Sequence, residues 1–248
     1  MLQNGKFTIS LAGICISVHA LYESTRTFCK EYLCDSEDSE FAVSISSEDI
    51  DFEREKSKKE DSLEGIPVRE FPDNYLETLA VYRKICTLFL DRNILLFHGS
   101  AVAVDGEAYL FTAKSGTGKS THTALWRQVF GERAVMINDD KPLLKLTPEG
   151  VLVCGTPWNG KHGLGCNKMV PLKAICILER ASDNRICRIS GKEALNMLVQ
   201  QSFRTGEPVG MLQLLELLNQ ITEKTALYRL GCNMDPQAAV VAYEVMKG

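Results

Sequence analysis

The chain has 248 residues, of which 45% are hydrophobic and 24% charged, and its formal net charge is −4. This length allows one large or two small domains with a sizeable core. The mildly acidic balance and the lack of a basic stripe argue against binding to nucleic acid or to an anionic membrane, because both need clustered Lys and Arg. No apolar stretch reaches the length of a membrane span.

The nine cysteines are odd in number and scattered, and none stands in a C-x-x-C pair. We therefore expect reduced, mostly buried thiols in a cytoplasmic protein, and no zinc site. Lys6 followed by the apolar residues 7–18 is similar to a secretory signal. We interpret this run as a strand, because a single lysine leads it and serines and a glycine interrupt it.

Residues 1–72 differ in pattern from the rest of the chain and predict a small N-terminal α+β region. The expected elements are strands within residues 7–20 bent at Gly13, a helix over residues 24–33 and a strand over residues 41–45. Residues 46–65 are charge-dense and lack a core-forming pattern, so we expect a solvated hairpin or a mobile linker there.

Pro67 and Pro72 mark the start of a second and larger domain, residues 73–248. This domain opens with apolar residues at helical spacing from Asp73 onward. Towards its end we expect helices over residues 190–201 and 211–221, a strand over residues 225–230 and a last helix ending near residue 247.

The most informative stretch lies between an apolar strand pattern at residues 107–112 and a helical pattern that Gly131 ends. It fits the P-loop template, with Ala113 where the template has glycine. In such a loop, backbone N–H groups surround a polyphosphate at the N-terminus of the following helix. The residues expected to bind nucleotide are Ser115, Gly116, Thr117, Gly118, Lys119, Ser120 and Thr121.

Within this loop we expect Lys119 to reach the β- and γ-phosphates and Ser120 to offer its hydroxyl to Mg²⁺. The alternative is a Gly/Ser turn that only resembles the motif. The order of strand, loop and helix favours the phosphate-binding interpretation.

Residues 134–138 form an apolar strand pattern that ends directly in Asp139 and Asp140. Ligands gather at the carboxyl ends of parallel strands, so we expect these carboxylates beside the phosphates. Adjacent residues of an extended backbone point in different directions, which suits one aspartate to Mg²⁺ and the other to a proton. The alternative is a turn in which both carboxylates are solvated.

Residues 98–104, the loop ending at Ser120, and residues 138–140 together resemble the catalytic domain of HPr kinase/phosphorylase and its relatives. The active site of that family is similar to that of the ATP-dependent phosphoenolpyruvate carboxykinases. The resemblance implies an α/β fold of this type and a kinase that uses ATP and Mg²⁺ to phosphorylate a serine hydroxyl. It also suggests a homo-oligomer.

The resemblance assigns roles to individual residues. Asp139 would take the proton of the hydroxyl, and His98 would lie near the transferring phosphate. Asp140 would bind Mg²⁺ together with Ser120. From its sequence position alone, His98 could instead be a hydrogen-bonded core residue.

The chain departs from family members that phosphorylate HPr. Those members carry a Glu-x-Arg-Gly segment after the aspartates, where this chain has residues 155–163. HPr as substrate and phosphorolysis of phosphoserine are therefore in doubt. Residues 158–161 and 170–175 resemble the HPr-kinase-like branch, whose members occur beside peptide-modifying enzymes and include kinases of a peptide serine.

Residues 155–165 contain four glycines and no apolar period, so we expect a mobile loop that closes over substrate. Lys161 is a candidate catalytic cation for the transferring phosphoryl group, and Trp158 a candidate for excluding water. The alternatives are a solvated surface lysine and a tryptophan packed on the sheet edge.

The sequence thus predicts an α/β protein in which residues 73–248 form a kinase-like catalytic domain acting on a serine of a peptide or protein. Two alternatives stay open: a nucleotide-binding regulatory ATPase without an acceptor, and a kinase of a small-molecule hydroxyl. Asp139 discriminates against the regulatory ATPase, because a nucleotide switch needs a metal-binding aspartate but no second carboxylate to accept a proton.

Overall fold

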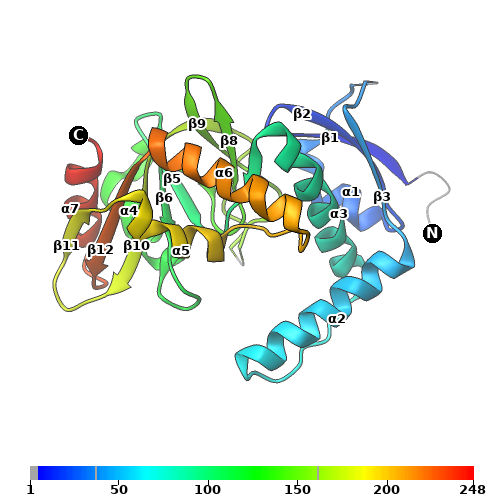
Figure 1. The fold of residues 1–248 in the computed structure, drawn as a ribbon, viewed down its shortest axis with the longest axis horizontal. Helices are drawn as coiled ribbons and strands as arrows, with labels where there is room; N and C mark the ends of the chain where they lie inside the picture. The colour runs from blue at the N-terminus through cyan, green and yellow to red at the C-terminus, as the bar shows by residue number, and fades with distance from the viewer. Residues whose placement is uncertain (1–4, 37, 161) are drawn as a thin grey trace. The chain divides into compact units, whose positions relative to one another are not determined.

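The computed structural model describes every residue except 1–4, 37 and 161, and the chain divides into two compact units (Figure 1). Unit 1 is Met1–Phe89 and unit 2 is Leu90–Gly248. Within the described residues, no helix is both long and apolar enough to cross a membrane.

The division differs from the boundary that the sequence predicted at residue 72. Helix α3 (Asp73–Phe89) packs against α1 (Glu23–Phe28) and α2 (Ser47–Glu64), so it belongs to unit 1. Its apolar residues at helical spacing are buried, as the pattern predicted. On the same helix, the buried carboxylate of Glu77 accepts hydrogen bonds from the backbone N–H groups of Leu21 (2.5 Å) and Tyr22 (3.2 Å).

Unit 1 also holds a three-stranded sheet. Its strands, in spatial order, are β1 (Lys6–Leu11), β2 (Ile14–His19) and β3 (Phe41–Ser44). β1 and β2 form an antiparallel hairpin, and β3 runs parallel to β2. The hairpin turns at Ala12 and Gly13, both with positive φ, which confirms the predicted bend at Gly13. The helix expected over residues 24–33 is α1 followed by the short helix η1 (Lys30–Tyr32).

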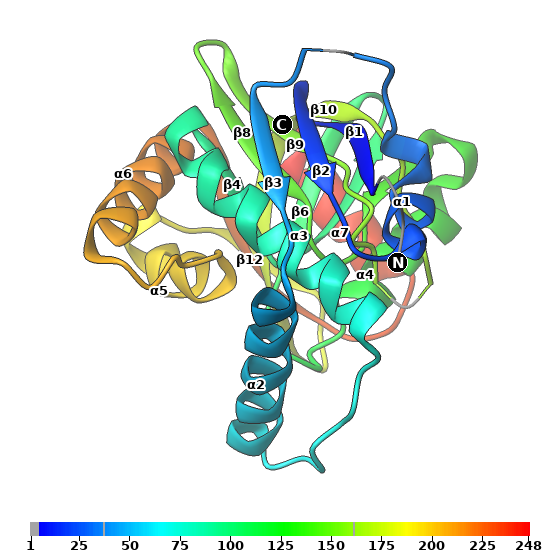
Figure 2. The same cartoon turned by 90° about the vertical axis from the view of Figure 1, so that its right-hand side faces the viewer.

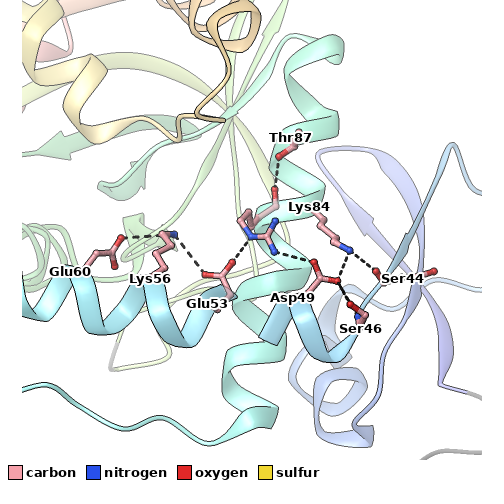
Figure 3. A network of polar contacts seen from close by, with 9 residues as sticks. Ser44, Ser46, Asp49, Glu53, Lys56, Glu60, Lys84 and Thr87 are labelled. Carbon is pink, nitrogen blue, oxygen red and sulfur yellow. Dashed lines mark hydrogen bonds and ion pairs between the residues drawn. The ribbon is translucent and has the colours of Figure 1, made fainter. Parts of the chain in front are cut away.

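The prediction of a hairpin or linker over residues 46–65 is wrong, because α2 occupies this segment. The helix begins where the backbone N–H of Ser46 donates to the Asp49 carboxylate (3.0 Å), and it ends at Gly65 in the left-handed conformation. Its acidic residues are matched by cations of α3: Arg83 donates to Glu53 (2.5 Å), and Lys84 donates to Asp49 (2.6 Å). Figure 3 shows the contact between Lys84 and Asp49. These partners lie 30 or more residues away in the sequence, so the local charge pattern did not reveal them.

Unit 2 is a mixed α/β unit built on a nine-stranded sheet. The strands are β4 (Ile94–Leu96), β5 (Ser100–Val104), β6 (Glu107–Thr112), β7 (Ala134–Asn138), β8 (Leu143–Thr147), β9 (Gly150–Cys154), β10 (Met169–Arg180), β11 (Arg185–Arg188) and β12 (Ala226–Cys232). The spatial order is β4-β8-β9-β10-β6-β5-β7, and β10 also pairs with β12, which pairs with β11.

Helices cover both faces of this sheet. Trp126 of α4 (Lys119–Phe130) and Ala242 of α7 (Gln237–Met246) share one buried cluster with the sheet, and Leu198 of α5 (Gly191–Gln201) and Leu214 of α6 (Pro208–Lys224) share the other. Figure 2 shows α5 and α6 side by side, apart from α4 and α7. The sheet is therefore shielded from water on both sides, as its continuous apolar strands require.

The strand over residues 107–112, the strand over 134–138 and the last four predicted elements are all present. The hairpin of β8 and β9 was not predicted, nor was β11. All nine cysteines are free thiols; four are buried, four are partly buried and Cys187 is exposed, so the expectation that most are buried is wrong. Burial raises the pKa of Cys154 to about 12, so its thiol stays protonated at neutral pH.

Candidate active site

The strand directions of unit 2 bring distant segments to one edge of the sheet. β5 runs antiparallel to both β6 and β7, while β10 runs parallel to β6 and β12 parallel to β10. The carboxyl ends of β6, β7, β10 and β12 and the amino end of β5 therefore lie at the same edge. The sequence predicted this placement for β6 and β7 without the antiparallel strand between them.

The predicted phosphate-binding residues occupy the connection between β6 and α4. Ala113 is buried, whereas Ser115, Gly116, Ser120 and Thr121 are exposed. Gly116 and Gly118 have positive φ values of 72° and 121°, which residues with a side chain rarely adopt. α4 begins at Lys119 and has 12 residues, so its N-terminal N–H groups face this loop.

Lys119 lies half-buried at the start of α4, and its ammonium donates to the carbonyl of Ala113 (3.4 Å). Burial lowers the pKa of Lys119, and the charges of Asp140 and Asp139 oppose this shift. The lysine and both aspartates thus share one electrostatic environment, as the sequence predicted. The side chains of Ser120 and Thr121 extend into solvent from the same helical turn.

Arg180 donates hydrogen bonds to the loop at residues 113–121, and the sequence pattern did not indicate this role. β10 pairs with the last residue of β6 at Ile177 and continues for three more residues to Arg180. The guanidinium there donates to the carbonyls of Gly116 (2.5 Å) and Thr117 (3.4 Å). These bonds occupy two carbonyl groups of the loop, and the N–H of Thr117 donates to the carbonyl of Lys114 (3.2 Å).

Asp139 is 7% exposed and follows the last residue of β7. Asn138 pairs with Ala101 of β5, so the next residue, Asp139, lies beside Ser100. The Ser100 hydroxyl donates to Asp139 Oδ1 (2.5 Å) and also lies 2.9 Å from the hydroxyl of Thr123 in α4. The sequence predicted Asp139 but neither of these buried hydroxyl groups.

Asp140 is half-exposed and lies 3.3 Å from His98, measured from carboxylate Oδ1 to Nε2. Burial favours a higher pKa for Asp140, but the hydrogen bond from His98 and the positive charges of Lys141 and Lys119 outweigh it and lower the pKa. Asp140 is therefore ionised at neutral pH. The structure brings His98, Asp140 and Lys119 together, as the sequence expected.

Asn138 fixes the turn that carries both aspartates. Its side-chain oxygen accepts from the N–H groups of Asp140 (2.8 Å) and Lys141 (2.7 Å), and its amide donates to Thr156 Oγ1 (2.9 Å). Asn138 is fully buried. The turn is thereby tied to the glycine-rich segment at residues 155–165.

This segment lies against the aspartates. A Cβ atom on Gly160 would come within 3.2 Å of the Asp139 carbonyl and 3.7 Å of Asp139 Oδ2. Trp158 is buried, with 4% of its surface exposed, and its backbone carbonyl accepts a hydrogen bond from the side-chain amide of Asn138 (3.5 Å). Lys161, the predicted catalytic cation, lies outside the described residues, so its role stays a prediction.

A cavity of ≈ 560 Å³ borders the loop between β6 and α4, which contains Gly116 and Gly118. Its wall combines Gly116 and Thr117 with the ends of β10 and β12, and it includes Leu178, Asn233 and Met234. Its size falls in the range of small-ligand sites, and its lining mixes apolar side chains with a few polar groups. The sequence did not predict this cavity, because its walls come from three segments, residues 116–125, 178–181 and 232–234, that are distant from one another in the chain.

In the described part of the chain, no group of three or more His, Cys, Asp and Glu side chains is arranged to hold a metal ion. Mg²⁺ keeps several waters and uses phosphate oxygens, so it needs only one or two protein ligands. The ionised Asp140 and the exposed hydroxyl of Ser120 suit that requirement.

No family model matches the sequence, and no curated protein matches it. Among solved structures, the chain is similar to the HPr(Ser) kinase/phosphatase from Coxiella burnetii. The match has 9% sequence identity and a TM-score of 0.34, and it covers 62% of this chain and 99% of that chain. A likeness at this TM-score supports neither fold nor function by itself, so both depend on the residues described above.

Proposed function

We propose that unit 2 is an ATP- and Mg²⁺-dependent kinase that transfers the γ-phosphoryl group to a hydroxyl, namely a serine of a peptide or protein. The carrying observation is that Lys119, Asp139 and Asp140 lie at the same edge of the sheet, next to the loop at residues 113–121, and that both aspartates act electrostatically on Lys119. A loop and helix N-terminus of this kind favour polyphosphate. The neighbouring cavity has room for the nucleoside of ATP.

Each residue has a role in this reaction. Lys119 and the loop N–H groups hold the phosphates, while Asp140 and Ser120 would hold Mg²⁺, which supplies positive charge to the phosphate oxygens. Asp139 accepts the proton as the acceptor O–H bond breaks, the new O–P bond forms, and the bond from the γ-phosphorus to ADP breaks. His98, next to Asp140, lies near the transferring phosphate, and Lys161 adds charge to it.

The second carboxylate favours a kinase over a regulatory ATPase. Asp140 alone would satisfy the metal, yet Asp139 is buried beside it and held by a neutral hydroxyl. Serine as acceptor and a homo-oligomeric state come from the resemblance of residues 98–104 and 138–140 to HPr-kinase-like proteins. A cytoplasmic location, where ATP is available, belongs to the same proposal.

The test is transfer of label from γ-labelled ATP to serine-containing peptides and HPr-like proteins in the presence of Mg²⁺. We expect labelled acceptor with the natural protein and a loss of about 10²–10³-fold in rate with Lys119→Ala. Lys173→Ala is the matched control, because Lys173 pairs with Glu107 (3.5 Å) away from the loop. It should keep full activity.

Two outcomes contradict the proposal. Slow ATP hydrolysis without any labelled acceptor would favour the regulatory ATPase. Equal loss of activity in Lys119→Ala and Lys173→Ala would show that the loop lysine has no special role.

A further inference from the structure

Ser100 is a polar residue in an apolar strand. It is fully buried, and all five residues of β5 (Ser100–Val104) are buried. A hydroxyl at this position contributes nothing to the sheet hydrogen bonds, which the backbone makes. Burial of an unpaired hydroxyl would be unfavourable, so its partners explain why it is tolerated.

Those partners are the Asp139 carboxylate (2.5 Å) and the Thr123 hydroxyl (2.9 Å). An ionised carboxylate only accepts hydrogen bonds, so Ser100 donates its single proton to Asp139. Thr123 must then donate to Ser100. The three groups form a directed chain from α4 to the aspartate, and both hydroxyl residues are at most 1% exposed.

Thr123 connects this chain to the phosphate-binding helix. The residue belongs to α4, and because its single hydroxyl proton goes to Ser100, it does not at the same time donate to the carbonyls of Lys119 (3.3 Å) and Ser120 (3.2 Å). The hydrogen bonds through Ser100 therefore hold Asp139 in a fixed position relative to α4, whose first turn carries the residues proposed to bind phosphate and metal. Ser100 donates to Oδ1 of Asp139. Within the described residues, Oδ2 of Asp139 accepts no hydrogen bond, and it lies on the side of Gly160.

We propose that Ser100, supported by Thr123, is a positioning residue that orients Asp139 with Oδ2 toward the acceptor hydroxyl. This inference rests on the proposed kinase reaction. Ser100 fixes one oxygen of the carboxylate, so the other oxygen presents its lone pairs to the acceptor. A reacting pair must be aligned within a fraction of an ångström, and a carboxylate free to rotate would lose that alignment.

The test compares variants that remove one hydroxyl each. Ser100→Ala and Thr123→Val should lower kcat for phosphoryl transfer by roughly tenfold to hundredfold, as expected for a lost hydrogen bond to a charged group. KM for Mg·ATP should stay within about twofold. Thr123→Ser keeps the hydroxyl and should restore kcat. Thr225→Val removes a buried hydroxyl that has no hydrogen-bond partner among the described residues, and it should leave kcat unchanged.

A double-variant cycle separates positioning from general destabilisation. If Ser100 acts through Asp139, adding Ser100→Ala to Asp139→Asn should cost no further activity, because the group being positioned is already gone. Thermal unfolding of each variant is followed in parallel by fluorescence of Trp126 and Trp158, both in unit 2.

Three results overturn the inference. These are an unchanged kcat in Ser100→Ala and Thr123→Val, a fall in affinity for Mg·ATP that accounts for the whole loss, and additive losses in the double variant. Absence of transfer by the natural protein would overturn the proposed function as well. Transfer that is insensitive to Ser100 would overturn this inference alone.

Discussion

Glu53 of unit 1 and Asp139 of unit 2 are buried carboxylates with different partners. In unit 1, Asp49 and Glu53 on α2 are met by the full positive charges of Arg83 and Lys84 on α3. In unit 2, Asp139 is met by the neutral Ser100 hydroxyl. Its neighbour Asp140 is met by the half-exposed His98 (3.3 Å) and by the ammonium group of Lys141 (3.7 Å).

The difference that separates a structural carboxylate from one available to a ligand is whether both of its oxygens have a partner, because Glu77 of unit 1 is also held by neutral donors and has both oxygens bonded. A buried carboxylate saturated by cations has no further need of a partner, and removing it leaves the cations uncompensated. A carboxylate with a free oxygen at a sheet edge is incompletely satisfied and gains from a bound cation or hydroxyl. The predictions below test this difference, beginning with the largest effect.

Asp139→Asn should lower phosphoryl transfer by about 10²–10⁴-fold, because an amide cannot accept the hydroxyl proton. Binding of Mg·ATP should stay close to that of the natural protein, since Asp139 does not hold the nucleotide. Calorimetric titration and single-turnover transfer measure the two quantities separately. A variant that transfers at the natural rate would remove the distinction between the two kinds of carboxylate.

His122 extends the comparison to a buried group for which the described part of the chain offers no charged partner. It accepts a hydrogen bond from Trp126 (3.0 Å), and burial lowers its pKa to about 4 from 6.5. The unfolded chain takes up this proton first, so stability is fully present above pH 6.5 and falls as the pH drops from 6.5 to 4. The loss should be on the order of 3 kcal/mol.

The measurement is urea unfolding of the natural protein and of His122→Asn, followed by tryptophan fluorescence at several pH values. The variant should show a flatter dependence of unfolding free energy on pH between 6.5 and 4. Identical pH dependence in the two proteins would mean that His122 is not held neutral.

Asp140→Asn should weaken the Mg²⁺ dependence of ATP binding by roughly tenfold to hundredfold, as expected for loss of a group that holds a metal. In the natural protein the pKa of Asp140 is lowered, so this carboxylate stays ionised in mild acid. Its metal binding should therefore weaken only at a pH below the usual pKa of an aspartate. Titrations with Mg²⁺ at fixed nucleotide test both statements. Unchanged Mg²⁺ affinity in the variant would remove the proposed role.

Glu53→Gln should have the opposite character, with no effect on phosphoryl transfer and a loss of about 1–2 kcal/mol in the stability of unit 1. Breaking a fully buried pair costs about 3–5 kcal/mol, but Arg83 is partly exposed to solvent and still has Asp49. Hydrogen exchange of the α2 and α3 amides reports this unit directly. A large fall in transfer would contradict the separation of structural from functional carboxylates.

The sequence predicted those parts of the site that are local in the chain. The strand at residues 107–112, the loop and α4 follow one another without a break, so apolar periodicity and turn residues sufficed. Asp139 and Asp140 were found because they end a strand. The roles of these residues stay predictions, as does that of Lys161.

What the sequence missed depends on pairing between distant segments. Ser100 meets Asp139 only because β5 lies between β6 and β7 in a particular register. The helix α2 was missed for the same reason, since its acidic residues find Arg83 and Lys84 only after α3 has formed. A charge-dense segment is predicted to be solvated when the residues that pair with it lie far away in the sequence.

The bond from Arg180 to the loop bears on when the site can form. Gly116 and Arg180 are separated by 64 residues, and the bond requires β10 to pair with β6. Contacts of such long sequence separation form slowly, and during synthesis the loop leaves the ribosome well before its partner. The nascent chain therefore carries the loop proposed to bind nucleotide for some time before Arg180 can bond to it.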